Sequence, residues 1–400
     1  GVKVDVTEWN RNDGFSPSQM ILAQVPGVDL GQTGTPSIID LEQSLSPDSP
    51  VVVIRASTGE QHLIFAELDA NTDDPSEQAF IIRPMDQFER GERYIVALRR
   101  MRDASGELLE APEVFRAFRD DTPTDNQAIE GRRQAMEDIF NILADAGIAR
   151  EELYLAWDFN IASVENITER VLHIRDDAFA SLGNAAPEFT VTEVVDYAPC
   201  GEGGCEDGQD AYKSRAIYGT FEVPNYLASD DGGPGFPFFY DEPDDGLPDR
   251  IGGDNMLTAN FYCSIARSVA EDFDEEPRAI ARPSLYGHGL LGSGEEALRG
   301  TGANVNIMAD NHQMMFCGTD WIGFSEQDAL YATQVLQDFS LFQNVLDRQQ
   351  QGFLNFMFLG RLLKHEQGLR SDPAFQAGGV PVFDNSSVYY DGNSQGGIMG

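Results

Sequence analysis

Short apolar runs separated by turn-forming residues dominate the first 122 residues of the chain. Residues 51–54 (VVVI) and 62–65 (HLIF) are two such runs, and residues 93–98 (RYIVAL) and 113–118 (EVFRAF) alternate between apolar and other side chains. Short runs of this kind, bounded by Gly, Pro, Asp and Ser clusters, predict β-strands. We therefore expect residues 1–122 to form a β-rich domain.

The period of the apolar residues changes after residue 122. Apolar side chains recur at helical spacing over 129–143, and Gly147 marks the predicted end of that helix. A strand is predicted over 153–161, and Ser163 begins a second predicted helix. These patterns predict a helical segment with one strand over 123–185. A β-rich, acidic insertion is expected over 186–275, and it contains a stretch rich in Asp, Gly and Pro at 229–254.

Predicted strands and helices alternate in the last part of the chain. Strands are expected at 278–286, 313–318 and 387–391. Helices are expected over 295–308 and within 325–363, where a break is predicted near 350–352. Alternation of strands and helices predicts a mostly parallel sheet. The expected fold class is therefore multidomain, with a β-rich N-terminal domain and an α/β domain over 276–400.

The charge of the chain excludes one class of partner. The chain has 67 acidic residues against 27 basic ones, which gives a formal net charge of −40. Nucleic-acid binding needs clustered Lys and Arg, so a nucleic-acid partner is not expected. No apolar run reaches the length of a transmembrane helix, about 18 residues or more. We expect a secreted or cell-surface protein whose export signal has been removed before Gly1.

The four cysteines predict disulfides. Cys200 and Cys205 lie in a short loop (PCGEGGC) that a disulfide can close, and Cys263 and Cys317 lie in apolar, strand-like segments. An even count in an acidic chain of this kind favours pairing. Zinc binding by Cys200 and Cys205 is the weaker alternative, and buried thiols are the alternative for the other two.

The motif Gly392-Asn-Ser-Gln-Gly396 carries the clearest chemical signal. It directly follows the predicted strand at 387–391, and the residues after it can begin a helix. A serine at a tight strand-to-helix turn needs small neighbours, and it presents its hydroxyl clear of the sheet. Ser394 is therefore the candidate nucleophile. The alternative is a glycine-rich loop with a solvated serine.

A second glycine-rich segment lies about a hundred residues earlier. Residues 286–292 (YGHGLLG) follow a predicted strand, where a backbone N–H is positioned to bind a developing oxyanion. Glycine allows the backbone to approach a substrate oxygen closely. The expected oxyanion residues are Gly289 and Leu290 from this loop and Gln395 after the nucleophile. A glycine-rich turn with a structurally bonded His288 is the alternative.

These segments resemble a known family. The motifs at 286–292, 319–325 (TDWIGFS) and 391–400 (DGNSQGGIMG) look like those of large bacterial secreted α/β-hydrolases, whose N-terminal domain is related to that of virulence-factor lipases. Residues 155–159 (LAWDF), followed by Ser163 and Asn166, also fit that pattern, and residues 80–118 resemble the last strands of bacterial Ig-like domains. The resemblance implies a serine esterase or lipase acting on a small-molecule or lipid carboxylic ester.

The resemblance also implies a triad that runs Ser, then Asp or Glu, then His. Only six residues follow Ser394, so the acid and the histidine are expected beyond Gly400. We therefore expect a missing C-terminal part or a second chain to complete the site and the sheet. Packing or surface roles are expected for the remaining histidines, which are His62, His173, His312 and His365.

Other functions remain open at this level. Peptidase or amidase chemistry uses the same parts, and a non-catalytic binding or surface-assembly protein could retain the serine turn as a relic. The acidic residues over 229–249 offer oxygen ligands for Ca²⁺. Their spacing does not match an EF-hand, so a solvated acidic loop is favoured over a Ca²⁺-stabilised carbohydrate-binding protein. No other cofactor is expected.

Overall fold

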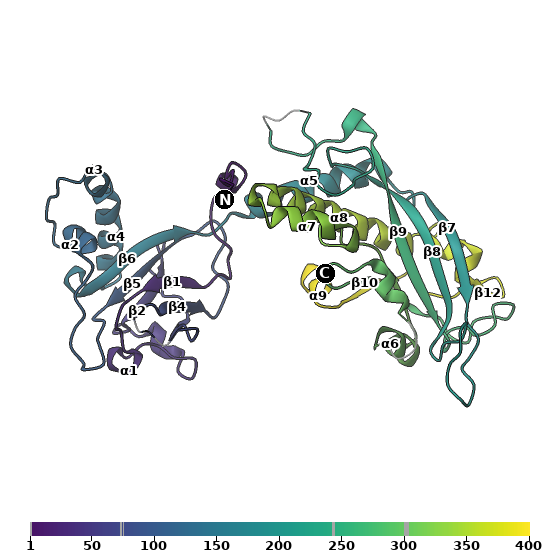
Figure 1. Cartoon of the computed structure of the whole chain (residues 1–400), viewed down its shortest axis with the longest axis horizontal. Helices are drawn as coiled ribbons and strands as arrows, with labels where there is room; N and C mark the ends of the chain where they lie inside the picture. The colour runs from purple at the N-terminus through teal and green to yellow at the C-terminus, as the bar shows by residue number, and fades with distance from the viewer. Residues whose placement is uncertain (1, 73, 75, 242–244, 300–303) are drawn as a thin grey trace. The chain divides into compact units, whose positions relative to one another are not determined.

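The computed structural model describes residues 2–72, 74, 76–241, 245–299 and 304–400. The chain divides into two compact units (Figure 1). The N-terminal unit is Trp9–Ile167, and the C-terminal unit combines Gly1–Glu8 with Thr168–Gly400. This division differs from the expected boundaries at 122/123, 185/186 and 275/276. Strand pairing explains the difference, because it joins segments that local sequence patterns assign separately.

The N-terminal unit contains two antiparallel sheets of three strands each, in the orders β1-β4-β3 and β2-β5-β6. Strand β5 lies in the middle of its sheet, between β2 and β6, and is buried from Tyr94 onward, where its apolar residues form one hydrophobic cluster with residues of helices α2 and α4. Helix α4 buries Met136, Ile139, Phe140 and Leu143, which are spaced at three and four residues. The strands are β1 (Ile21–Gln24), β2 (Val51–Arg55), β3 (Ile64–Leu68), β4 (Ala79–Pro84), β5 (Arg93–Arg99) and β6 (Leu153–Asn160).

One predicted strand of this unit is wrong, and one predicted segment is joined to a sheet by strand pairing. The alternating segment 113–118 is not a strand but part of helix α2 (Glu113–Arg119), which buries Phe115 and Phe118. The strand predicted within 123–185 is β6, which pairs with β5 and completes the β2-β5-β6 sheet. The other α-helices that begin in the N-terminal unit are α1 (Leu30–Thr33), α3 (Gln127–Glu130), α4 (Arg133–Asp145) and α5 (Val164–Leu182), the last of which continues into the C-terminal unit.

One mixed sheet of six strands organises the C-terminal unit, in the order β14-β10-β11-β9-β8-β7. Strands β10, β11 and β14 are parallel, whereas β9, β8 and β7 are joined to them and to one another in antiparallel pairs. The expected β-rich insertion over 186–275 is therefore part of this same sheet. The strands are β7 (Phe189–Asp196), β8 (Lys213–Pro224), β9 (Met256–Ala266), β10 (Arg282–Gly287), β11 (Met314–Gly318) and β14 (Tyr389–Gly392).

The chain crosses the parallel part of the sheet twice, in opposite directions. It passes from β10 through α6 (Asn304–His312) to β11, and then back through α7 (Ala329–Val335) and α8 (Phe342–Lys364) to β14 on the other side of β10. Because such crossovers are right-handed, the two connections place their helices on opposite faces of the sheet. Figure 1 shows α8 on one side of β10 and α6 on the other.

Helix α8 is continuous where a break was predicted. Gln351 and Gly352 are buried within it, and a Cβ on Gly352 would lie 3.3 Å from the carbonyl oxygen of Ile322. The interruption lies earlier, between α7 and α8, where the chain forms a short 3-10 turn at Phe339–Leu341. The glycine therefore marks a close packing contact and not the end of a helix.

Both predicted disulfides are present in the structure. Cys200 is bonded to Cys205, and Cys263 is bonded to Cys317. The second pair is fully buried and joins directly opposite residues of β9 and β11. Disulfides persist mainly in oxidising compartments, so this pairing is consistent with an extracellular protein.

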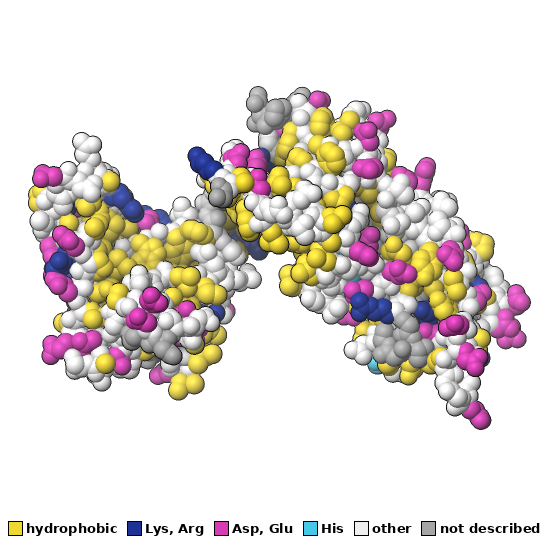
Figure 2. Space-filling view, in the orientation of Figure 1, with side chains coloured by type: hydrophobic (Ala, Val, Ile, Leu, Met, Phe, Trp, Pro, Cys, Tyr) yellow, Lys and Arg dark blue, Asp and Glu magenta, His cyan; other side chains and the backbone are white. Residues whose placement is uncertain are grey.

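The surface is acidic on the face that Figure 2 shows, where Asp and Glu side chains are scattered over both units and basic side chains are fewer. Among the residues that the structure describes, no helix combines the length and the apolar character needed to cross a bilayer.

Candidate active site

The order of the parallel strands places a switch point beside β10. The chain leaves β10 toward β11 on one side and returns to β14 on the other. The carboxyl ends of β10 and β14 are adjacent, with Gly287 opposite Gly392. In open α/β sheets, ligands bind in the crevice outside the carboxyl ends of strands at such a switch point. The two segments singled out from the sequence begin here.

Ser394 lies at the turn between β14 and α9 (Gln395–Met399). It is exposed, and its backbone has φ 53° and ψ −114°. A non-glycine residue at positive φ is strained, and such residues persist where the surrounding structure holds them. Among the described residues, no side chain or backbone group forms a hydrogen bond with the Ser394 hydroxyl. The hydroxyl is thus free to react with a ligand at the switch point.

Close backbone packing explains the glycines of the motif. A Cβ on Gly287 would lie 2.8 Å from Cα of Gly396, and a Cβ on Gly392 would lie 2.8 Å from the backbone nitrogen of Gly397. A Cβ on Gly396 would overlap the backbone of Gly287. The end of β10, the end of β14 and the start of α9 are therefore in direct contact, and this contact fixes the strained turn.

The loop after β10 lies beside Ser394. A Cβ placed on Gly289 would be 3.9 Å from Cβ of Ser394 and 3.3 Å from Nδ2 of Asn393. The N–H of Gly289 donates to Oε2 of Glu296 at 3.3 Å, so this predicted oxyanion donor is already engaged. The N–H groups of Leu290 and Gln395, in contrast, have no acceptor among the described residues. Gln395 directly follows the serine, and Leu290 directly follows Gly289, whose position lies close to Ser394.

His288 is fully buried between the loops that follow β10 and β11. Its Nε2 accepts a hydrogen bond from the backbone N–H of Trp321 at 2.7 Å, and its Nδ1 lies 2.7 Å from the carbonyl oxygen of Gly289. Both ring nitrogens are therefore engaged by backbone groups, and neither is hydrogen-bonded to Ser394 as a general base would be. Trp321 stacks on Phe356 of α8 with ring centroids 3.8 Å apart, which anchors this contact to the helix layer.

A buried ion pair holds the loop after β11. Arg348 of α8 donates to Asp328 at 2.7 Å, and both side chains are almost fully buried. The other oxygen of Asp328 accepts hydrogen bonds from the N–H groups of Gly323 and Ser325. This loop in turn binds the loop after β10, because Leu291 donates to the carbonyl of Phe324 at 2.9 Å. Both loops around the serine are therefore rigidly supported.

The remaining histidines do not form hydrogen bonds with Ser394 in the described part of the chain. His62 belongs to the N-terminal unit and contacts the carbonyl of Asp86, and Nε2 of His365 contacts the carbonyl of Asn184 at 2.7 Å. His312 ends α6, beside the start of β10 and thus at the opposite end of that strand from Gly287. His173 is half-buried on α5. Within the described residues, no histidine is therefore hydrogen-bonded to the serine as a general base.

Several residues at the site were not found from the sequence. Burial raises the pKa of Asp320, whose carboxylate follows β11 and accepts a hydrogen bond from the N–H of Gly294 at 2.8 Å. Burial also raises the pKa of Tyr390, whose hydroxyl donates to the carbonyl of Gly396 at 2.5 Å. The buried side chain of Gln395 has neither amide atom paired with a described residue. No local pattern distinguishes these residues, since each contact joins segments that are distant in sequence or in separate elements.

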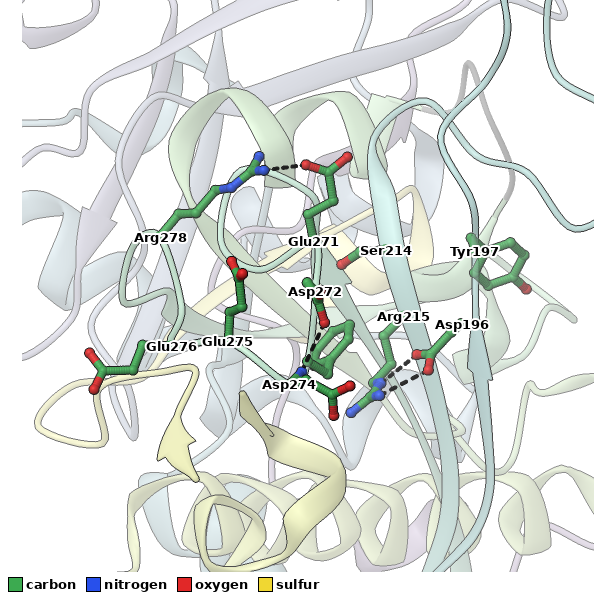
Figure 3. Close-up of a pocket in the computed structure, with 11 residues that line it drawn as sticks. Asp196, Tyr197, Ser214, Arg215, Glu271, Asp272, Asp274, Glu275, Glu276 and Arg278 are labelled. Atoms are coloured by element: carbon green, nitrogen blue, oxygen red, sulfur yellow. Dashed lines mark hydrogen bonds and ion pairs between the residues drawn. The ribbon is translucent and has the colours of Figure 1, made fainter. Parts of the chain in front are cut away.

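Two cavities lie at different ends of the sheet. One of about 480 Å³ lies next to the serine turn and is lined by residues of β10, α6 and β14, including Tyr286, Val305, Asp391 and Asn393. A larger one of about 610 Å³ lies among β7, β8 and the loop after β9 (Figure 3). Because β9 runs antiparallel to β11, that loop lies at the amino ends of the parallel strands. The larger cavity is therefore remote from Ser394.

The larger cavity is acidic, and its two arginines are paired. Arg215 binds Asp196 at 2.6 Å, and Arg278 binds Glu271. Figure 3 shows both pairs, with further carboxylates from the loop after β9 around them. Paired arginines leave little positive charge to attract an anionic ligand. Nothing in this cavity resembles a catalytic arrangement.

The acidic loop gives no metal site in the part that can be described. Glu242, Pro243 and Asp244 lie outside the described residues. Over the described residues of the chain, no group of three or more His, Cys, Asp or Glu side chains is arranged to hold a metal ion. Within the loop, Asp249 instead accepts a hydrogen bond from the N–H of Asp241 at 2.8 Å. The Ca²⁺ hypothesis therefore stays a prediction.

Comparisons with protein-family models, with curated proteins and with solved structures find no match to this chain. Any functional conclusion therefore depends on the site itself.

Proposed function

We propose that the C-terminal unit is a serine hydrolase domain of the α/β-hydrolase type that cleaves carboxylic esters with Ser394 as nucleophile. The observation that carries the proposal is the strained, exposed serine at the switch point, beside a loop with a free N–H. A serine on a sharp strand-to-helix turn, with an oxyanion loop after an earlier strand, is the arrangement of this enzyme type. The resemblance of the motifs at 286–292 and 391–400 adds to it.

The proposed reaction is acyl transfer through a covalent intermediate. The Ser394 hydroxyl attacks the ester carbonyl and loses its proton to a general base. The N–H groups of Leu290 and Gln395 bind the negative oxygen of the tetrahedral intermediate. As the intermediate collapses, the protonated base gives its proton to the leaving alcohol, and an acyl-serine remains. Water, deprotonated by the same base, then attacks the acyl-serine, which releases the carboxylic acid and restores the serine hydroxyl. The same residues could act on an amide, and the substrate class is assigned to esters on the resemblance alone.

The proposed reaction requires a histidine as general base and a carboxylate that orients it, and neither is hydrogen-bonded to Ser394 among the described residues. Since no described histidine is bonded to Ser394, a further part of the protein or a second chain would supply both groups. We further propose that the protein is secreted or on the cell surface of a bacterium, a location that the two disulfides and the acidic surface favour. An Ig-like identity for the N-terminal unit remains part of this proposal, although helix α2 replaces one of the strands on which it was based.

A fluorophosphonate probe tests the activated serine directly. The folded protein, isolated from its natural source, is labelled, digested and analysed by mass spectrometry. We expect label on Ser394 and its loss in Ser394→Ala. The matched control is Ser387→Ala, which removes another exposed serine from the same region and should leave labelling unchanged.

Absence of label on Ser394 in the folded protein would contradict the catalytic proposal. The better account would then be a non-catalytic binding or surface-assembly protein that retains the turn. One observation favours this second candidate, namely that no described histidine contacts the serine.

A further inference from the structure

The orientation of one peptide unit decides where the Leu290 N–H points. A peptide bond is planar and trans, so its C=O and N–H point in opposite directions. In the peptide between Gly289 and Leu290, the carbonyl oxygen lies 2.7 Å from Nδ1 of His288 and also accepts the N–H of Gly292 at 3.0 Å. Whatever fixes this carbonyl also fixes the direction of the Leu290 N–H.

The hydrogen bonds of His288 determine its protonation. A backbone N–H can only donate, so the bond from Trp321 requires Nε2 of His288 to be an unprotonated acceptor. A carbonyl can only accept, so the contact with Gly289 requires a proton on Nδ1. Only the neutral ring with its proton on Nδ1 satisfies both partners. The ring is fully buried, and these two backbone groups engage both of its nitrogens.

The ring is held on its far side by the helix layer. Trp321 is 1 % exposed, and its indole stacks on Phe356 and meets Phe353 edge-on. Its backbone N–H therefore has a fixed position, and it sets the plane of the imidazole ring. On the other side of Gly289, the N–H of that residue is held by Glu296. Both backbone groups of Gly289 are thus held, the carbonyl by His288 and the N–H by Glu296.

We infer that His288 is a positioning residue that aims the Leu290 N–H at the oxyanion by holding the carbonyl of the same peptide. This role rests on the proposed serine hydrolase function and goes beyond it, because it assigns one donor and the side chain that directs it. Two hydrogen bonds to the Gly289 carbonyl also polarise the peptide, which strengthens the N–H as a donor. His288 itself touches neither substrate nor nucleophile.

Two substitutions separate the two hydrogen bonds of the ring. His288→Asn places an amide nitrogen near the position of Nδ1 and can keep the donor to Gly289, whereas His288→Gln extends to the position of Nε2 and can keep only the bond to Trp321. The probe is hydrolysis of p-nitrophenyl acetate by the full protein. Loss of an oxyanion donor lowers kcat by roughly 10²–10³-fold. We expect His288→Gln to fall in about this range and His288→Asn to retain clearly more, with KM little changed in both.

The matched control is His62→Asn, in the N-terminal unit, which should leave kcat unchanged. Urea unfolding of each variant checks that it is folded. Equal kcat in the two His288 variants, a greater loss in the asparagine variant, or a change confined to KM would overturn the inference.

A measurement that does not need activity separates this inference from the proposed function. Nitrogen NMR of the protein labelled with ¹⁵N-histidine should show one ring with a protonated Nδ1 and an unprotonated Nε2, and this signal should be lost in both His288 variants. A protonated Nε2 would overturn the inference even if Ser394 is catalytic. The expected tautomer without label on Ser394 would refute the proposed function and the oxyanion role of Leu290, while the hold of His288 on the peptide would stand.

Discussion

Replacement of Ser394 by glycine should stabilise the protein while it abolishes the reactive group. Ser394 has φ 53° and ψ −114°, a region that side chains with a Cβ rarely adopt. Strain of this kind costs about 1–3 kcal/mol. Glycine relieves this strain, but it lowers the free energy of unfolding by about 0.4–1 kcal/mol because it gives the unfolded chain greater conformational freedom. The difference leaves a net gain of about 1 kcal/mol in the free energy of unfolding.

The matched variant is Ser394→Ala, which keeps the Cβ and so keeps the strain. Its hydroxyl is exposed and bonded to no described group, so its removal should change stability by less than about 0.5 kcal/mol. Both variants should lose fluorophosphonate labelling equally. Because both variants lack the hydroxyl, a difference in their free energies of unfolding reports only the backbone strain and the unfolded-chain freedom at position 394.

Equilibrium urea unfolding and calorimetry measure the difference. A gain of about 1 kcal/mol corresponds to a rise in Tm of about 2–4 °C for a unit of this size. The slopes of the urea transitions must agree between variants, so that the midpoints can be compared. If Ser394→Gly is no more stable than Ser394→Ala, the turn is not strained and the central observation behind the proposed function is removed.

Three further predictions concern the packing around the site. Gly396→Ala should lower the free energy of unfolding by about 1–3 kcal/mol and reduce labelling, because its Cβ overlaps the backbone of Gly287, whereas Gly397→Ala is the milder control. Double replacement of Cys263 and Cys317 by alanine should lower the free energy of unfolding by about 4 kcal/mol, since that disulfide closes a loop with a sequence separation of 54. Removal of the disulfide between Cys200 and Cys205, whose separation is 5, should lower it by less. Burial raises the pKa of Asp347 above its ordinary value of 3.8, so the folded state binds the proton more tightly. The wild type should therefore lose stability relative to Asp347→Asn as the pH rises from about 3.8 through the raised pKa, which urea midpoints measured across this range would check. A constant difference in midpoint would contradict this last expectation.

The sequence predicted the serine turn because local spacing encodes it. Glycines two residues before and two residues after Ser394, directly behind a short strand, leave few alternatives to a tight turn with close backbone contacts. The same holds for helix α4, whose apolar residues recur at three and four positions. These features depend on residues that are neighbours along the chain.

The errors came from features that depend on distant contacts. Residues 113–118 alternate like a strand, but Phe115 and Phe118 are also three residues apart and form the buried side of helix α2. A short segment fits both periods, and the contact with β6 decides between them. Strand pairing crosses the predicted boundary at 275/276, because β9 pairs with β11 across the intervening loop and strand β10. His288 and Glu296 could not be assigned roles, since their partners are known only once the loops meet.

The buried disulfide between β9 and β11 has a consequence for cleavage of the chain by proteases. Its two cysteines bracket the loop after β9, strand β10 and helix α6, and they lie opposite each other in the middle of the sheet. A single cut between residues 263 and 317 would leave both fragments joined covalently and hydrogen-bonded in the same sheet. The serine turn, which lies after the second cysteine, would stay attached to the antiparallel half. A protein with this cross-link can therefore be cut once in this segment, and its two fragments stay covalently joined until a reductant breaks the disulfide.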